Sequence, residues 1–209
     1  MRNKGKDFFS SYFGKNGMSL WIAIFFLILG ISIGAFAEKM MSVSQKNDLL
    51  MFVDSYFNVM HLENISKSQI FIQSLVNNYK ILIIILLSGA TVIGFPIALI
   101  ALTFKGITVG FAAAFFMEEM KIKGLFITIS SILPQNLVFV PVLVMAVSVA
   151  LGFSSKILLR KGNTGNNKGY IYQLSTYLIV FMILGGIYFV GCLIETYISP
   201  ALIKMIVSV

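Results

Sequence analysis

Residues 20–37 read LWIAIFFLILGISIGAFA, an unbroken apolar run between a basic N-terminal segment and Glu38. A helix of about 20 mostly apolar residues spans the hydrocarbon core of a bilayer, and this run is close to that length. Four more apolar runs follow, at residues 81–104, 107–117, 125–153 and 177–194. The run at 107–117 is short, and it spans a bilayer only if Lys105 and Glu118 at its two ends reach toward the headgroups. The sequence predicts an all-α, polytopic integral membrane protein with about five transmembrane helices.

The composition supports this class. Hydrophobic residues make up 58% of the chain and charged residues 11%, which leaves too little polar surface to coat a soluble globule. Basic residues concentrate at 2–15 and 156–168, so the positive-inside rule predicts a cytoplasmic N-terminus and, after five spans, an external C-terminus. The formal net charge of +8 therefore indicates topology and contact with anionic lipid. Nucleic acid is not an expected partner.

An alternative for the first run is a secretory signal, because Ala35, Phe36 and Ala37 form an A-x-A pattern before Glu38. The run is longer than a typical signal h-region, so we expect it to be retained as the first helix. Cys192 is the single cysteine and can form no intrachain disulfide.

The chain divides into a basic cytoplasmic tail, residues 1–18, and one transmembrane domain, residues 19–209, with an outer loop at 38–79. The tail has aromatic residues at helical spacing, which suits an interfacial amphipathic helix or an unstructured juxtamembrane segment. The outer loop has apolar residues at i, i+3, i+4 and i+7, which predicts an extracytoplasmic amphipathic helix. Its apolar stripe packs on the membrane or the spans, or it docks a partner. The candidate docking residues are Phe52, Tyr56, Phe57 and Met60.

Small residues recur four apart in two spans. Gly30 and Gly34 lie on one face of the first span, and Gly106, Gly110 and Ala114 lie on one face of the third. Such small-xxx-small patterns mark helix packing, within a chain or across a homo-oligomer. The only residues between the second and third runs are Lys105 and Gly106, so the sequence predicts a tight antiparallel hairpin there.

Proline interrupts two of the predicted spans. Gly94 and Pro96 predict a break in the second span. In the fourth, Pro134 lies in the most polar intramembrane group, which comprises Ser130, Ser131, Gln135 and Asn136. These side chains either satisfy the carbonyl that proline leaves unbonded or line a polar pathway through a broken helix. Glu118 and Glu195 fall at predicted span ends, so no span is expected to carry a well-buried charge.

Catalytic motifs are absent from the sequence. It has no HExxH, no CxxC, no Walker loop and no G-x-S-x-G, and His61 is the only histidine. We therefore expect a protein that is not an enzyme and needs no metal or cofactor.

Three stretches carry a family resemblance: GFPIALIALTFKGITVGF at 94–111, LPQN at 133–136 and IETYISPAL at 194–202. With them the chain resembles the stage II sporulation protein M family. The resemblance implies a non-catalytic membrane scaffold of sporulation engulfment, at the septal and engulfing mother-cell membrane of an endospore-forming bacterium. It also implies two partners, the stage II sporulation proteins P and D, which degrade peptidoglycan. The residues alone leave one alternative, a channel or permease subunit built on the polar, proline-broken second and fourth spans.

Overall fold

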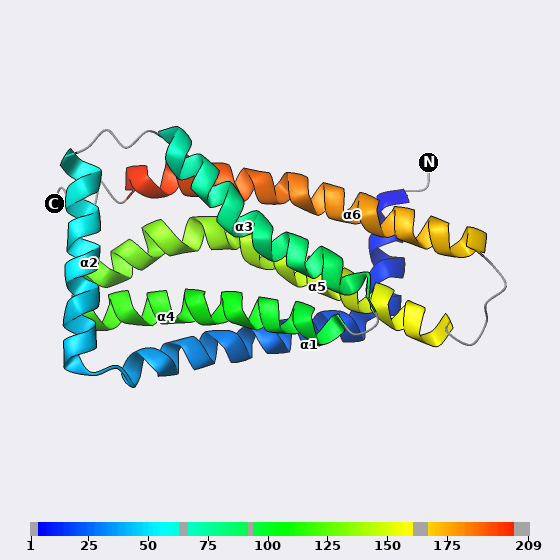
Figure 1. The fold of residues 1–209 in the computed structure, drawn as a ribbon, viewed down its shortest axis with the longest axis horizontal. Helices are drawn as coiled ribbons and strands as arrows, with labels where there is room; N and C mark the ends of the chain where they lie inside the picture. The colour runs from blue at the N-terminus through cyan, green and yellow to red at the C-terminus, as the bar shows by residue number, and fades with distance from the viewer. Residues whose placement is uncertain (1–3, 63–66, 92–93, 161–166, 203–209) are drawn as a thin grey trace.

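The computed structural model describes residues 4–62, 67–91, 94–160 and 167–202, and the regular secondary structure within them is helical. The elements are α1 (Lys4–Lys39), α2 (Val43–Leu62), α3 (Lys67–Gly89), α4 (Phe95–Ile127), the π-helix η1 (Thr128–Ile132), α5 (Leu133–Arg160), α6 (Asn167–Leu193) and the π-helix η2 (Ile194–Ile198). Helices α1, α3, α4, α5 and α6 run along the long axis of the molecule, and α2 lies across one end of them (Figure 1). We call this the α2 end, and the opposite end, where α3 connects to α4, the Gly94 end.

Within the described residues, four helical segments are long and apolar enough to cross a membrane. They are Gly17–Lys39, Ser68–Gly89, Phe95–Ser155 and Ile171–Leu202. The third has 61 residues, and a straight helix of that length would extend about 90 Å, which is far more than one bilayer crossing. The prediction of a helical, polytopic membrane protein is confirmed.

This long segment reverses direction at Lys121. The backbone there has φ 48° and ψ −120°, which is not helical, while the residues around it are. Gly124 consequently lies against the carbonyl of Phe116, eight residues earlier, which a straight helix would hold well apart. The segment thus forms two limbs, residues 95–120 of α4 and a second limb that runs from residue 122 through η1 and α5, and they lie side by side in opposite directions (Figure 1).

The predicted boundary between the second and third spans is wrong. Helix α3 ends at Gly89 and α4 begins at Phe95, and α4 continues through Lys105 without a break. Backbone bonds from Thr91 N to Ser88 O (3.1 Å) and from Gly94 N to Thr91 O (3.3 Å) close the turn. Pro96 then occupies the first turn of α4, where a missing N–H costs nothing.

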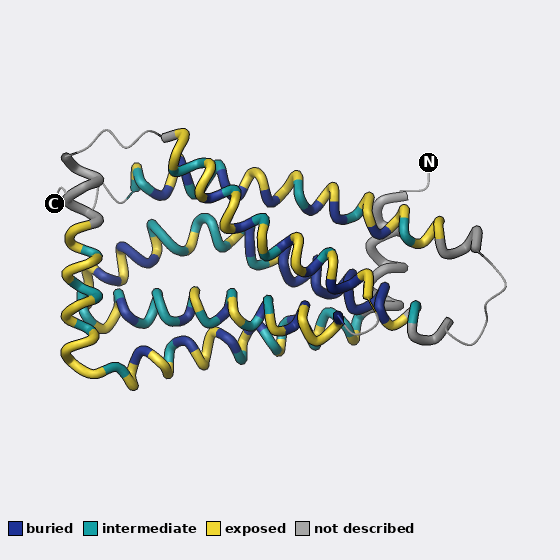
Figure 2. The backbone as a smooth tube through the Cα atoms, in the orientation of Figure 1, coloured by how far each residue is buried: buried dark blue, intermediate teal, exposed yellow. Residues whose placement is uncertain are grey.

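Helix α5 forms the centre of the bundle. Almost every side chain between Val142 and Ser154 is buried, whereas α1, α3, α4 and α6 alternate between buried and exposed residues (Figure 2). Large apolar side chains on the outer faces are exposed, including Phe25, Ile100 and Met182. In a membrane protein this is the surface that lipid covers, while the helical backbone satisfies its own hydrogen bonds.

The glycines of α1 and α4 lie against each other. A Cβ at Gly30 would meet the carbonyl of Thr103, and one at Gly106 would stand 2.7 Å from the carbonyl of Leu27. Gly34 and Gly110 are equally close to the backbone of the facing helix, and Ala114 is half-buried. The glycine seam therefore joins α1 to α4 within one chain. The hairpin predicted at Lys105 and Gly106 does not form, because α4 is continuous there.

Candidate functional site

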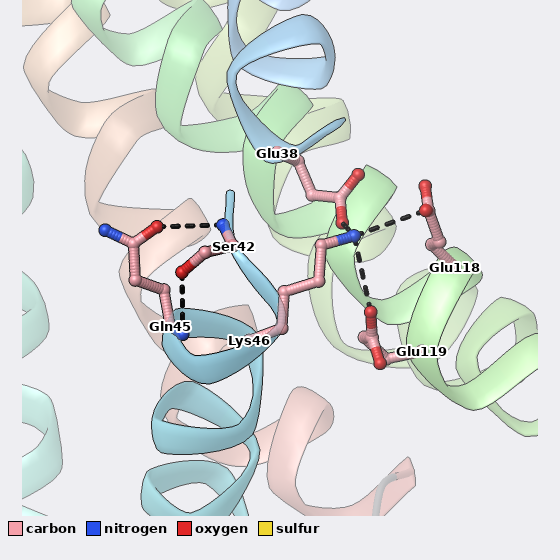
Figure 3. Close-up of polar contacts among 6 residues, drawn as sticks. All are labelled: Glu38, Ser42, Gln45, Lys46, Glu118 and Glu119. Carbon is pink, nitrogen blue, oxygen red and sulfur yellow. Dashed lines mark hydrogen bonds and ion pairs between the residues drawn. The ribbon is translucent and has the colours of Figure 1, made fainter. Parts of the chain in front are cut away.

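Helix α2 starts with a capping box. Ser42 precedes the helix, and its backbone N–H donates to Gln45 Oε1 at 3.0 Å, while the Gln45 N–H donates to Ser42 Oγ at 3.4 Å (Figure 3). These reciprocal bonds satisfy two backbone donors that a helix start leaves free. The cap follows α1 directly and lets the chain turn sharply, so α2 begins at the end of the bundle.

Lys46 fastens α2 to the bundle. Its Nζ lies 2.5 Å from Glu38 Oε1 of α1, 3.2 Å from Glu118 Oε1 and 3.4 Å from Glu119 Oε1, both of α4 (Figure 3). The Glu38 side chain is fully buried, so this ammonium is the counter-charge that makes its burial tolerable. The hydrogen bond with Glu38 raises the pKa of Lys46 above its usual value. One cation thus ties together the ends of α1, α2 and α4.

The two sides of α2 differ in exposure. Leu49, Leu50 and Val53 are half-buried, whereas Met51 and Phe52 are each 69% exposed. Of the predicted docking residues, Phe52 is therefore on an open surface. The side chains of Tyr56, Phe57 and Met60 lie outside the described residues.

A second polar cluster lies inside the bundle. The Oε2 of Glu195 in η2 accepts hydrogen bonds from Ser74 Oγ at 2.5 Å and Asn78 Nδ2 at 2.7 Å, both from α3. The Nζ of Lys105 in α4 donates to Asn78 Oδ1 at 3.3 Å and stands 5.3 Å from the centre of the Phe139 ring. Asn78 thus links an ammonium and a carboxylate that come from two other helices.

This cluster places a charged group within a span, although Lys105 and Glu195 are both half-buried rather than fully buried. Lys105 is ten residues into α4, about 15 Å from its start at 1.5 Å per residue, which is half of a bilayer core. The prediction that Lys105 marks a span end is wrong, because Asn78 and the Phe139 ring supply the partners that water would otherwise provide. A charge inside a membrane bundle is costly and commonly has a function.

A cavity of about 410 Å³ lies between α2 and this cluster. Its lining comes from five regions of the chain, and the residues are Phe52, Val53, Ile70, Gln73, Ser74, Asn77, Phe116, Ile127, Ser131, Gln135, Glu195, Ser199 and Pro200. Two of the predicted intramembrane polar residues, Ser131 and Gln135, are thus brought to Glu195. The π-helices η1 and η2 each contribute to the wall, and π-helical turns occur frequently at functional sites.

The other two intramembrane polar residues do not line this cavity. Ser130 is half-buried in η1. Asn136 donates from Nδ2 to the carbonyl of Ile132 at 2.7 Å, and its buried Oδ1 has no hydrogen-bond partner in the described part of the chain. Asn136 thus bonds its own helix next to Pro134.

The interpretation of the sequence missed Lys105, Asn78 and Glu195 as a group. A signal was present: Gly94 and Pro96 are helix-start residues, and a span starting there has full membrane length and contains Lys105 in its middle. Splitting the sequence at Lys105 instead gave a third span that was too short.

The family model for stage II sporulation protein M matches residues 22–200. The chain belongs to the stage II sporulation protein M family. No curated protein and no solved structure matches it. The match to this family extends from the start of the first apolar helix to Pro200 and includes α2, both polar clusters and the cavity.

Proposed function

We propose that this chain is a non-catalytic membrane scaffold of sporulation engulfment, which anchors the peptidoglycan-degrading stage II sporulation proteins P and D at the septal and engulfing mother-cell membrane. The observation that carries the proposal is the placement of α2. Lys46 and the Ser42 cap hold it across the end of the bundle, and Met51 and Phe52 project from it, each 69% exposed. A helix fixed in this way offers a preorganised apolar surface, which lowers the entropic cost of docking.

The proposal requires the α2 end to be extracytoplasmic, with the N-terminus in the cytoplasm. The basic cluster at 156–168 supports this orientation, since it falls where α5 and α6 connect, at the opposite end from α2 (Figure 1). Single cysteines in a Cys192→Ser background test it. An impermeant maleimide added to intact cells should label Lys123→Cys at the α2 end and should label Ala90→Cys at the Gly94 end only after lysis. The reverse pattern would place α2 in the cytoplasm and end the scaffold proposal.

The docking test is the double replacement Met51→Ala with Phe52→Ala. Truncating an aromatic anchor commonly costs about 2 kcal/mol or more of binding, which is about a thirtyfold loss of affinity. Capture of protein P or D from detergent extracts of sporulating cells should fall while membrane abundance stays normal. The matched control is Ile122→Ala, which truncates an apolar side chain that is 74% exposed at the same end but not on α2. Unchanged capture by the double variant would contradict docking on α2.

The candidate docking surface extends toward Tyr56, Phe57 and Met60 along the sequence. Adding Phe57→Ala to the double replacement should reduce capture further if these residues share the contact. The glycine seam is occupied within the chain, so a homo-oligomer would have to use another surface.

The second candidate is a channel or permease subunit, which the cavity with Ser131 and Gln135 favours. A conducting path would also have to continue from Lys105 to the Gly94 end. There the interior is filled by Leu82, Ile85, Leu102 and Leu143, each at most 5% exposed. This packing supports the scaffold as the first candidate. Transport of solute into vesicles that is abolished by Gln135→Ala would reverse the order.

A further inference from the structure

We propose that the cavity beneath α2 binds a protonated amine on an apolar stem, with Glu195 as its counter-ion. This site is additional to the docking role of α2. The proposal stands on the chemistry of the cavity wall, and its test uses the purified protein alone, so neither proposal depends on the outcome of the other.

Glu195 is the acidic residue of the cavity. It is the only charged residue among the described residues that line the cavity. Its Oε2 accepts from Ser74 and Asn78, and these hydrogen bonds leave its Oε1 open to another donor. A carboxylate that is held by one oxygen and open at the other is a fixed acceptor for a cation.

The Ser199 hydroxyl is an independent indication that the cavity binds a polar ligand. The residue lines the cavity and is only 5% exposed, and its buried Oγ has no partner in the part of the chain that the structure describes. A buried polar group without a partner is costly, and such groups usually bond to water or a ligand. It lies four residues after Glu195 in a helical segment, so the two side chains share a face.

The rest of the wall selects the ligand class. An ammonium has three donors and no acceptor, and Glu195, Ser199 and the side chain of Ser131 or Gln135 offer acceptors. Phe116 and Ile127 give the remaining wall an apolar character, and the volume of about 410 Å³ is that of a small-molecule site. Together these features fit an alkylammonium better than a hydrated metal ion.

Lys105 is a positioning residue here. It does not line the cavity and acts through Asn78, whose amide bonds both Lys105 and Glu195. It binds the other end of the Asn78 amide and leaves Oε1 of Glu195 to an incoming cation. The same ligand chemistry can come from a free amine or from a lysine side chain of a docked protein.

The first test measures the charge preference of the cavity. In a Cys192→Ser background, Ser131→Cys places a thiol on the cavity wall. Its reaction rates are measured with a cationic reagent, aminoethyl methanethiosulfonate, and an anionic one, sulfonatoethyl methanethiosulfonate. Each rate is divided by the rate of the same reagent with a free thiol. The cationic reagent should be favoured at least about tenfold, and Glu195→Gln should reduce the preference to about twofold. Lys123→Cys is the control outside the cavity, and Glu195→Gln should leave its ratio unchanged. Equal rates at Ser131→Cys with Glu195 intact would overturn the proposal.

The second test needs no change at Glu195, so a folding defect of that variant cannot obscure it. n-Butylammonium should slow labelling of Ser131→Cys at least about threefold at millimolar concentration, and n-butanol should not. Protection by butylammonium but not by Nα-acetyl-lysine methylamide supports a free amine, and protection by both supports a lysine side chain. If n-butylammonium does not protect the thiol, or if n-butanol protects it equally, the proposal is overturned.

Discussion

Lys105 of α4 and Glu195 of η2 are joined through one side chain, Asn78 of α3, which accepts from the ammonium at 3.3 Å and donates to the carboxylate at 2.7 Å. Opposite charges in a bundle interior normally meet directly, because each must be compensated. Here an amide stands between them and uses both of its ends. Three helices are therefore locked in register by a single connected group of side chains.

The first prediction concerns this linkage. Lys105→Met and Glu195→Gln should each lower the free energy of unfolding by about 1–3 kcal/mol, because each leaves a polar partner uncompensated. The double variant should lose at least about 1 kcal/mol less than the sum of the two. Unfolding by SDS titration in mixed micelles measures this. Thr108→Ala is the control, since the exposed Thr108 hydroxyl bonds only a carbonyl of its own helix. Strictly additive losses would show that the two charges are independent.

The second prediction concerns the glycine seam. Gly110→Ala should lower stability by about 1–3 kcal/mol, because the added Cβ would meet the carbonyl of Ile31 and push α1 away from α4. The matched control is Gly186→Ala in α6, where a Cβ meets nothing within 4 Å. That change should be neutral or stabilise by up to about 1 kcal/mol through helix propensity. Both are scored by folded yield in the membrane and by unfolding in micelles, and equal effects would refute the contact.

The third prediction concerns the reversal at Lys121. Its φ of 48° with ψ −120° suits glycine and strains any residue with a Cβ. Lys121→Gly should therefore raise the free energy of unfolding by about 1 kcal/mol. Lys123→Gly, two residues later in helical backbone, should lower it by up to about 1 kcal/mol. The opposite signs of two lysine-to-glycine changes distinguish relief of strain from an effect of charge.

The fourth prediction concerns Lys46. Lys46→Met leaves the buried Glu38 without its counter-charge, so α2 should detach and become sensitive to chymotrypsin. Adding Glu38→Gln removes the uncompensated charge and should restore resistance. A raised lysine pKa contributes stability that is complete below the ordinary value of about 10.4 and is lost only above it. Resistance of the unmodified chain should therefore be constant between about pH 6 and pH 9, and a loss within that range would contradict the ion pair.

Two segments that contain lysines show which features of the fold the sequence predicts. The predicted spans at 107–117 and 125–153 leave polar residues between them, among them Lys121 and Lys123, and the structure places the reversal of the chain at Lys121. Lys105 was also expected to mark a span end, and it lies half-buried inside the bundle. What makes its burial possible is Asn78, 27 residues away, and Glu195, which lies 90 residues further along. The sequence pattern around Lys105 includes neither residue, so it could not predict this position inside the bundle.

The glycine seams show the same division. The four-residue spacing of Gly30 and Gly34 predicts close helix packing, because small residues on one helix face let another backbone approach. Which helix packs against α1 depends on the order and direction of all the spans. Because a turn was predicted at Lys105, α4 was not identified as that helix. The cavity depends on side chains from α2, α3, α4, η1, α5 and η2 and forms only when the chain is folded.

The attachment of α2 also has a mechanical consequence. Any pull on α2, such as a partner docked there under the proposed function would exert, reaches α1 and α4 through Lys46. The backbones of these two helices touch, since Gly30, Gly34, Gly106 and Gly110 each lie against the backbone of the facing helix. Tension applied to α2 is thus carried by a pair of helices in direct backbone contact.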